Sequence, residues 1–175
     1  MMTIETERLI LRPLRDSDID EYAEMCADEQ VMQFLGGTLA RDMAWRQMAT
    51  ILGHWHLRGF GFWGVEWKQT GELAGRLGCW QPEGWPEFEV GWTLRRSFWG
   101  RGIATEGAEA SLRHAFTTLG RDRVISLINP DNTPSIRVAE RIGERHDGHA
   151  VIFDNEVRVY AITLDEWASR QAQKA

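Results

Sequence analysis

The most regular pattern in the chain is an alternation of apolar and polar positions near its middle. Between residues 88 and 94, large apolar side chains occupy every second position, and Glu89, Gly91 and Thr93 lie between them. Period-two alternation predicts a strand with two different faces. A glycine inside a strand weakens it and often marks a bulge or a close approach by a ligand or another backbone. The apolar positions are Phe88, Val90, Trp92 and Leu94.

A glycine-rich loop and a helix follow this strand. Apolar positions recur at helical spacing from Ala104 to Leu119, and Gly120 ends the pattern. The first amides of a helix have no internal partners and carry partial positive charge, so small residues before the helix allow an anion to reach them. The strand, loop and helix therefore predict a phosphate site, most simply for a pyrophosphate. Three cations surround the same loop, Arg95, Arg96 and Arg101.

The remaining periodicity predicts an α+β fold around a mixed sheet. Before the central strand we expect a strand at 6–14, a helix from Asp16 or Ser17 as its cap to Cys26, an irregular stretch at 30–38, a helix at 41–57 and a hairpin of strands at 61–67 and 72–80. After the central helix we expect a strand at 123–129, a helix capped by Asn132 or Thr133 that stops at Gly143, strands at 144–153 and 156–164, and a short helix at 165–170.

Composition places the chain among ordinary globular proteins. Its 175 residues are 43% hydrophobic and 26% charged, which fits one domain over 1–175. No apolar run has the length of a signal peptide or a membrane span, so we expect a cytoplasmic protein without a membrane partner. The net charge of −6 argues against general nucleic-acid binding. The sequence leaves open whether the protein is a monomer or a homodimer.

The cysteines and histidines do not indicate a metal site. Cys26 and Cys79 lie far apart, without a second cysteine or a histidine at metal-ligand spacing. We expect both to be buried thiols without a disulfide. The histidines have no clear metal spacing either, since His54 and His56 are two residues apart and would face different sides of a helix. No metal is expected.

Two common phosphate-binding motifs are absent from the glycine loop. The dinucleotide fingerprint requires a third glycine where Thr105 stands, and no acidic residue follows at the end of the next strand. The nucleoside-triphosphate loop requires a lysine after its last glycine, but the chain contains only Lys68 and Lys174. A different phosphate ligand is indicated.

The loop Trp99-Gly100-Arg101-Gly102-Ile103-Ala104 resembles the acetyl-coenzyme A loop of the GNAT N-acetyltransferase superfamily, R/Q-x-x-G-x-G/A, with tryptophan in place of the usual first residue. The run W-G-x-G-I-A-T-E, which continues to Glu106, is similar to the RimJ/RimL-type ribosomal-protein N-acetyltransferases. So are the T-x-R-L-x-L-R opening and the ending of the chain. A second motif of this branch, N-x-x-S-x-x-V followed by I-G, is matched by Asn132, Ser135, Val138, Ile142 and Gly143. Glu144 stands where an aromatic residue often follows the glycine.

The resemblance covers nearly the whole chain and implies the GNAT fold and direct acetyl transfer from acetyl-coenzyme A to an amine. It also implies that the helical pair before the hairpin borders the acceptor site. The residues it assigns to coenzyme binding are Trp92, Thr93, Leu94, Trp99, Gly100, Arg101, Gly102, Ile103, Ala104, Thr105 and Asn132.

Three catalytic tasks follow from this resemblance. A backbone amide within 90–94 would bind the carbonyl oxygen as it becomes negative. Glu89 is the predicted base, acting directly or through a water, with Glu87 as the reserve, and Ser135 is the predicted acid. Each has a simpler alternative, because Glu89 would equally suit a solvated strand position, and Asn132 and Ser135 would equally suit a helix cap.

The acceptor is the least constrained part of the hypothesis. We expect the α-amine of a protein or peptide, with a small-molecule amine as the alternative and a non-catalytic acyl-coenzyme A-binding module as the alternative of a different class. Seven of the nine tryptophans precede the coenzyme loop. They indicate either a core and lid packed with large rings or an aromatic acceptor pocket.

Overall fold

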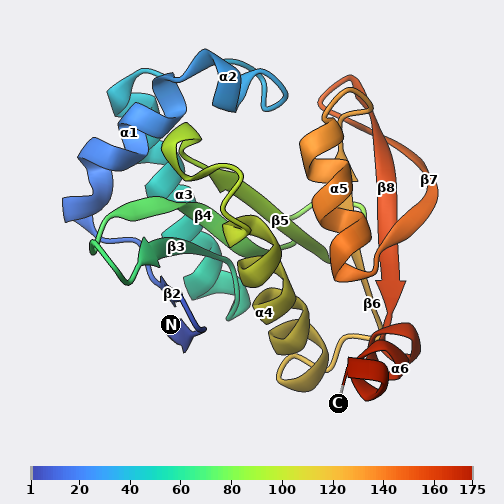
Figure 1. Ribbon diagram of the computed structural model, residues 1–175. Coiled ribbons are helices and arrows are strands. Elements are labelled where there is room, and N and C mark those ends of the chain that lie inside the picture. The colour runs from blue at the N-terminus through green and yellow to red at the C-terminus, as the bar shows by residue number, and fades with distance from the viewer. Residues whose placement is uncertain (1, 175) are drawn as a thin grey trace.

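The computed structural model describes residues 2–174 and has a mixed eight-stranded sheet flanked by helices (Figure 1). The strand order is β1-β2-β3-β4-β5-β6-β8-β7, and every neighbouring pair is antiparallel except β5 and β6. This arrangement confirms the predicted α+β class. The strands are β1 Ile4–Glu5, β2 Leu9–Arg12, β3 Phe62–Trp67, β4 Leu73–Trp80, β5 Glu89–Leu94, β6 Arg123–Ile128, β7 Arg145–Ile152 and β8 Asn155–Thr163. The helices are α1 Ile19–Ala27, α2 Glu29–Met32, α3 Arg41–Arg58, α4 Ile103–Thr117, α5 Thr133–Ile142 and α6 Leu164–Lys174.

Most predicted elements are present, and the differences lie in short segments. The strand expected at 6–14 is β2, and the short β1 pairs with it. The stretch expected to be irregular contains α2, because the Asp28 carboxylate accepts hydrogen bonds from the Gln30 and Val31 amides and so caps a single helical turn. The last helix extends to Lys174 rather than to Arg170.

The predicted cap of the first helix is wrong. Asp16 and Ser17 lie inside a short 3-10 turn, Asp16–Asp18, and no side chain caps α1. The carboxylate that matters is Asp18, which makes a two-bonded ion pair at 2.8 Å with Arg12 and accepts the Arg15 amide at 2.7 Å. A buried arginine requires such a partner, and Arg12 also donates to Glu66.

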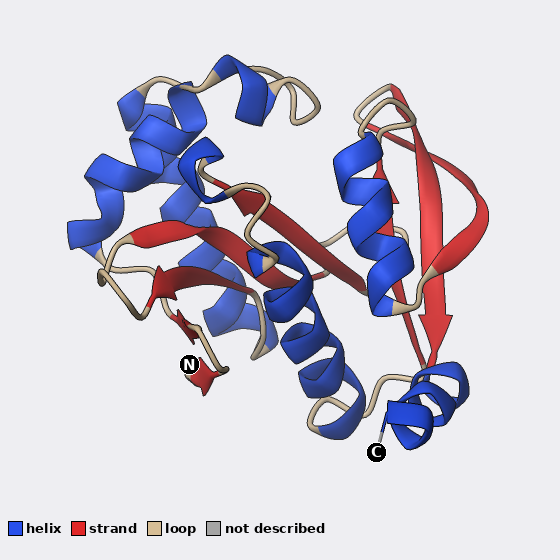
Figure 2. Cartoon of the chain, viewed as in Figure 1, coloured by secondary structure: helices blue, strands red, loops and turns tan. Residues whose placement is uncertain are grey.

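Helices lie on both faces of the sheet (Figure 2). One face carries α4, since Gly107 packs closely on Leu77 of β4 and the Cys79 thiol lies 3.9 Å from the Ser111 carbonyl oxygen. The other face carries α1 and α3, and His54 of α3 stacks on Trp80. The side chains of Cys79 and Trp80, which are consecutive in β4, therefore point to opposite faces of the sheet, as those of neighbouring residues in a strand do.

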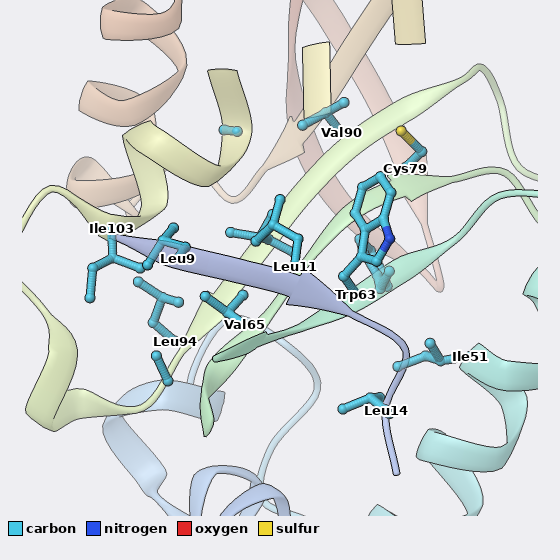
Figure 3. Packing of buried hydrophobic residues seen from close by; sticks show 14 of the residues in the cluster. Leu9, Leu11, Leu14, Ile51, Trp63, Val65, Cys79, Val90, Leu94 and Ile103 are labelled. Atoms are coloured by element: carbon cyan, nitrogen blue, oxygen red, sulfur yellow. The ribbon is translucent and has the colours of Figure 1, made fainter. Parts of the chain in front are cut away.

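One part of the core lies between β2, β3, β5 and α4. Figure 3 shows Leu9, Val65, Leu94 and Ile103 side by side, one from each of these elements, and all four are buried. Trp63 is fully buried in the same cluster. The interpretation of the tryptophans as core packing is therefore right for Trp63.

Candidate functional site

The site begins where β5 and β6 separate. The two strands share one parallel pair, Glu89 with Ile125, whose amide donates to the Phe88 carbonyl oxygen at 2.9 Å. One residue further along each strand, a side chain replaces the backbone hydrogen bonds between β5 and β6. The Ser126 Oγ lies 2.7 Å from the Val90 carbonyl oxygen. On its other edge β5 stays paired with β4 as far as Leu94. The second half of β5 therefore has one open edge.

The open edge leaves backbone groups of β5 without strand partners. Alternate residues of a strand direct their amide and carbonyl to the same edge, so Trp92 and Leu94 face the opening as Val90 does. The Leu94 carbonyl accepts the Trp99 indole N–H at 2.9 Å. Trp92 lies between the two carbonyls that side chains satisfy, and its own amide faces the opening. The two strands thus diverge here, and of the two features that a glycine inside a strand can mark, the bulge is absent from the β4–β5 register at Gly91.

The glycine loop presents the start of α4 to the same side. Gly100 and Gly102 have φ values of +73° and +76°, which L-residues rarely adopt. Gly102 is the N-cap of α4, and no side chain caps this end of the helix. The amides of Ile103, Ala104 and Thr105 are therefore available to a ligand. The loop has the form that an anion site requires.

The N-terminal segment holds this loop in place. Arg8 donates from Nε to Glu106 at 2.6 Å and from Nη1 to the Arg101 carbonyl oxygen at 2.7 Å, and the Thr6 hydroxyl donates to Glu106 at 2.5 Å. Burial alone would raise the pKa of Glu106, but the hydrogen bonds from Thr6 and Arg8 outweigh it and lower the pKa. Two sequence motifs about a hundred residues apart are thus the two halves of one contact.

Two of the three cations expected around the loop have other partners. Arg95 pairs with Glu21 and Glu24 of α1 at 3.4 and 2.5 Å. Arg96 pairs with Asp28 at 3.0 Å. Arg101 lies over the Phe98 ring at 5.3 Å and makes no ion pair within residues 2–174. The expectation for Arg95 and Arg96 is corrected, because acids of the first helical segment neutralise both side chains.

Glu89 is buried at the point where the strands part. One carboxylate oxygen accepts the Trp85 indole N–H at 2.7 Å, and the other lies 3.5 Å from the Leu127 amide nitrogen. Burial raises the pKa of Glu89 to about 7, although these two hydrogen bonds and the charge of Arg76 oppose the rise. The alternative of a solvated outward side chain is wrong, because Glu89 is only 8% exposed.

A second buried carboxyl group, Glu144, lies behind the divergence and was not predicted as part of the site. Its Oε1 is 3.0 Å from the Ser126 Oγ, which also contacts the Val90 carbonyl. A hydroxyl has one hydrogen and a carbonyl only accepts, so Ser126 donates to Val90 and the proton of the second bond comes from Glu144 in its acid form. Burial raises the pKa of Glu144 well above its ordinary value, and the neighbouring Glu89 adds to the rise.

Ser135 and Asn132 lie at the start of α5. The Asn132 side chain accepts the Ser135 amide at 3.2 Å, which confirms its capping role. The Ser135 hydroxyl oxygen lies 3.3 Å from the Trp92 indole nitrogen, which donates to it. Trp92 and Glu89 point to opposite faces of β5. The predicted base and the predicted acid are therefore on opposite sides of the sheet, with the divergence between them.

The reserve candidate Glu87 is occupied elsewhere. It accepts a 2.8 Å hydrogen bond from Arg123 in an ion pair at the protein surface. A carboxylate held by an arginine at the surface is less available to a substrate than one at the point where the strands part. Glu89 is the better candidate.

Known proteins with similar sequences and structures are acetyltransferases. The sequence profile of the acetyltransferase (GNAT) domain family matches residues 8–145. The chain belongs to the GNAT family. It is an acetyl-coenzyme A-dependent acetyltransferase, so the alternative of a non-catalytic binding module finds no support.

Individual relatives cover most of the chain. An acetyltransferase structure from Agrobacterium tumefaciens is 36% identical, with a TM-score of 0.84, over 93% of this chain and 94% of that one. An uncharacterized N-acetyltransferase, p20, of Bacillus licheniformis is 29% identical over 85% of each chain. The ribosomal-protein-S5-alanine acetyltransferase of Vibrio fischeri has a TM-score of 0.75 at 18% identity, over 95% and 99% of the two chains, and so shares the fold.

Within residues 2–174 there is no group of three or more His, Cys, Asp or Glu side chains that could hold a metal ion. In the same part of the chain, no helix is long and apolar enough to span a membrane. Cys26 and Cys79 are both free and buried, as predicted.

The acid form of Glu144 makes the stability of this acetyltransferase pH-dependent. In the unfolded chain the side chain loses its proton near pH 4.3, whereas in the folded protein its pKa is raised and it keeps the proton. Its contribution is complete below the unfolded pKa and is lost as the pH rises, at up to about 1.4 kcal/mol per pH unit. We expect Glu144→Gln, which still donates to Ser126, to flatten the urea-unfolding free energy between about pH 5 and pH 8 relative to wild type. Equal slopes in the two proteins would contradict a protonated Glu144.

Proposed function

We propose that this GNAT acetyltransferase transfers the acetyl group to the α-amine at the N-terminus of a protein or peptide, with Glu89 as the general base. The observation that carries the proposal is one buried carboxyl group with a pKa of about 7, located where the strands part. A base with a pKa near the working pH combines a large deprotonated fraction with a useful driving force for proton transfer.

The strength of this base favours an α-amine over a lysine side chain. A free α-amine titrates near 7.7 to 8.0 and a lysine amine near 10.4, so at neutral pH the lysine needs roughly 3.5 kcal/mol more to reach its nucleophilic form. In the described chain, Glu89 has no histidine or second ionised carboxylate bonded to it that would strengthen it as a base. It suits the more acidic amine.

The coenzyme is proposed to lie along the open edge of β5 and across the loop. The amides at the start of α4 would bind the pyrophosphate, with Arg101 as the nearby cation that has no carboxylate partner in the described residues. The Trp92 amide would face the thioester carbonyl, and Leu94 and Trp99 would border the chain of the coenzyme. The Thr93 side chain points to the opposite face and its backbone faces β4, so Thr93 is left out of the proposed coenzyme contacts.

The proposed reaction involves two proton transfers, one from the amine to Glu89 on one side of the sheet and one from Ser135 to the leaving sulfur on the other side. The amine nitrogen attacks the thioester carbon, the oxygen becomes negative against the Trp92 amide, and Glu89 takes the proton that the nitrogen loses, directly or through a water. The carbon–sulfur bond then breaks and the sulfur leaves as a thiolate. The Ser135 hydroxyl would donate to that sulfur, because its oxygen already accepts the Trp92 indole and its hydrogen has no acceptor in the described residues.

A small-molecule amine is the second candidate acceptor. The observation that favours it is the aromatic border of the base. The Trp85 ring, which donates to Glu89, has its centroid 6.1 Å from that of Phe153 at the tip of the β7–β8 hairpin. Phe153 is 85% exposed, so an apolar acceptor would find an exposed ring beside the base.

The loop assignment predicts that Gly102→Val weakens acetyl-coenzyme A binding about a hundredfold, because two lost amide–phosphate hydrogen bonds are worth about 3 kcal/mol. A side chain at Gly102 would lie 3.3 Å from the Arg8 guanidinium and would disturb the loop. Gly120→Val is the matched control, since Gly120 also has positive φ and open surroundings but follows the other end of α4. Calorimetry in which both variants bind as tightly as wild type would show that the site is elsewhere.

The base assignment predicts that Glu89→Gln lowers kcat about a hundredfold or more while the Kd for acetyl-coenzyme A changes little. The wild-type rate should rise with pH through about 7 as Glu89 loses its proton. In Glu89→Gln this limb should vanish and only the titration of the acceptor amine should remain. A pH–rate profile that is the same in both proteins would remove Glu89 from the mechanism.

The acceptor class is tested by a screen that follows coenzyme A release. Peptides with free N-termini, the same peptides with blocked N-termini and one lysine, amino acids, polyamines and aminoglycosides are compared at one concentration. We expect turnover with free N-termini and little with the blocked, lysine-bearing peptides, because of the difference in amine pKa. Robust acetylation of a small amine while every peptide is inert would overturn the choice of acceptor.

A further inference from the structure

A row of stacked groups runs along β4 on the face that carries α1 and α3. The Arg76 guanidinium lies 4.7 Å from the centroid of the Phe62 ring, and that ring stacks on Trp80 at 4.8 Å with an angle of 7°. Trp80 in turn stacks on His54 at 4.3 Å. Phe62 is the strand partner of Gly78, which stands between Arg76 and Trp80 in β4, and its ring contacts both of these side chains.

The neighbouring strand β5 forms a second row beside the first. Its residues on this face are Glu89, Gly91 and Thr93, whose partners on β4 are Trp80, Gly78 and Arg76, respectively. A methyl group at Gly91 would lie 3.3 Å from Glu89 Oε1 and 3.3 Å from the Phe62 ring. Gly91 has ordinary φ, so its backbone does not require glycine, and the missing side chain allows Glu89 and the Phe62 ring to approach the strand this closely.

Glu89 and Arg76 thus mark the two ends of one surface whose floor is Gly91 and whose wall is Phe62. Glu89 and Thr93 are four residues apart, about 13 Å along a strand. Both charged side chains lean over the floor, since Glu89 reaches Gly91 and the Arg76 guanidinium lies against the Phe62 ring. The two charged side chains therefore approach one another across Gly91, closer than this strand length.

Arg76 differs from two other enclosed arginines of the described chain, Arg12 and Arg95. Arg12 is paired with Asp18 and Glu66, and Arg95 with Glu21 and Glu24. Arg76 is half-buried and has no ion pair within residues 2–174, and its Nε is buried without a hydrogen-bond acceptor. A guanidinium that is partly removed from water without a partner anion is unfavourable, and its planar donors match a carboxylate.

We propose that Arg76 binds a carboxylate carried by the acceptor, while Glu89 at the other end of the surface faces the acceptor amine. This inference rests on the proposed function and specifies its substrate class. The preferred acceptors are peptides whose first or second residue is aspartate or glutamate. A free amino acid carries the same two charges and is the other possible source of the carboxylate.

The test compares acceptors that differ only in one charge. One arm uses peptides with Asp or Glu against Asn or Gln at the first and then the second position, and the other uses amino acids against their carboxamides. We expect kcat/KM to be at least tenfold higher for the charged member of a pair in wild type, as a charge-assisted hydrogen bond implies. In Arg76→Gln the ratio should approach one, and Arg76→Lys should restore part of it.

Arg121 offers a matched control. Its guanidinium also lies on aromatic rings, 4.5 Å from that of Phe88 and 5.3 Å from that of Phe60, and its Nε is also buried without an acceptor. Arg121 lies outside the two rows, so Arg121→Gln should keep the wild-type ratio. Acetyl-coenzyme A affinity and circular dichroism verify that each variant is folded.

The outcomes separate the two proposals. Acetylation of peptides without a preference for the carboxylate, or a preference that survives Arg76→Gln, overturns the role of Arg76 and leaves the acceptor class intact. Inert peptides together with a tenfold preference for amino acids over their carboxamides overturn the peptide acceptor and support Arg76. A ratio near one in every arm overturns the inference whichever amine reacts.

Discussion

The structure depends on how β5 leaves its parallel neighbour. Buried backbone amides and carbonyls require partners, and a strand that leaves its sheet loses them on one edge. Here the Ser126 hydroxyl satisfies the Val90 carbonyl and the Trp99 indole satisfies the Leu94 carbonyl. The backbone of Trp92 between them faces the opening. An edge with two of its carbonyls already satisfied by side chains is a ready-made binding surface, because the donors that remain are fixed in direction.

The same divergence sets the protonation of two carboxyl groups. Glu89 and Glu144 are both buried near the point of separation, and two neighbouring carboxylates do not ionise together in a region poor in water. The Ser126 hydroxyl has one hydrogen, which it donates to the Val90 carbonyl oxygen. The hydrogen between Ser126 and Glu144 therefore belongs to the Glu144 carboxyl group. Glu89 is then the group that titrates near neutrality, and its hydrogen bond from Trp85 stabilises the ionised form. A protonated Glu144 leaves Glu89 as the carboxyl group that can ionise, which the proposed role of Glu89 as the base requires, although Glu144 does not contact the proposed acceptor surface.

Much of this arrangement could be predicted from local pattern. The alternation of residues 88 to 94 gave the two faces of β5 correctly, and the glycine loop and the Asn132 cap lie where the motifs indicate. These features depend on residues close together in the chain. The partners of Arg95 and Arg96 lie on segments about 70 residues away, so the sequence could not assign them. The cap at Asp16 or Ser17 was wrong for a local reason, because both residues lie in the 3-10 turn before the helix and the Asp18 carboxylate binds Arg12 instead of capping α1. Glu144 carried one signal, an acid where the related motif often has an aromatic residue, but its contact with Ser126 required the fold.

Residue-level amide hydrogen exchange, with and without coenzyme A, tests the central claim most directly, because it reports on the backbone groups that the divergence leaves open. The account predicts that coenzyme A slows exchange at Trp92 and Leu94 and at Ile103, Ala104 and Thr105. Exchange at Gly91 and Thr93, whose backbones face β4, should change little. Protection that leaves the open edge of β5 and the start of α4 unaffected, or that is equal at neighbouring residues of β5, would contradict it.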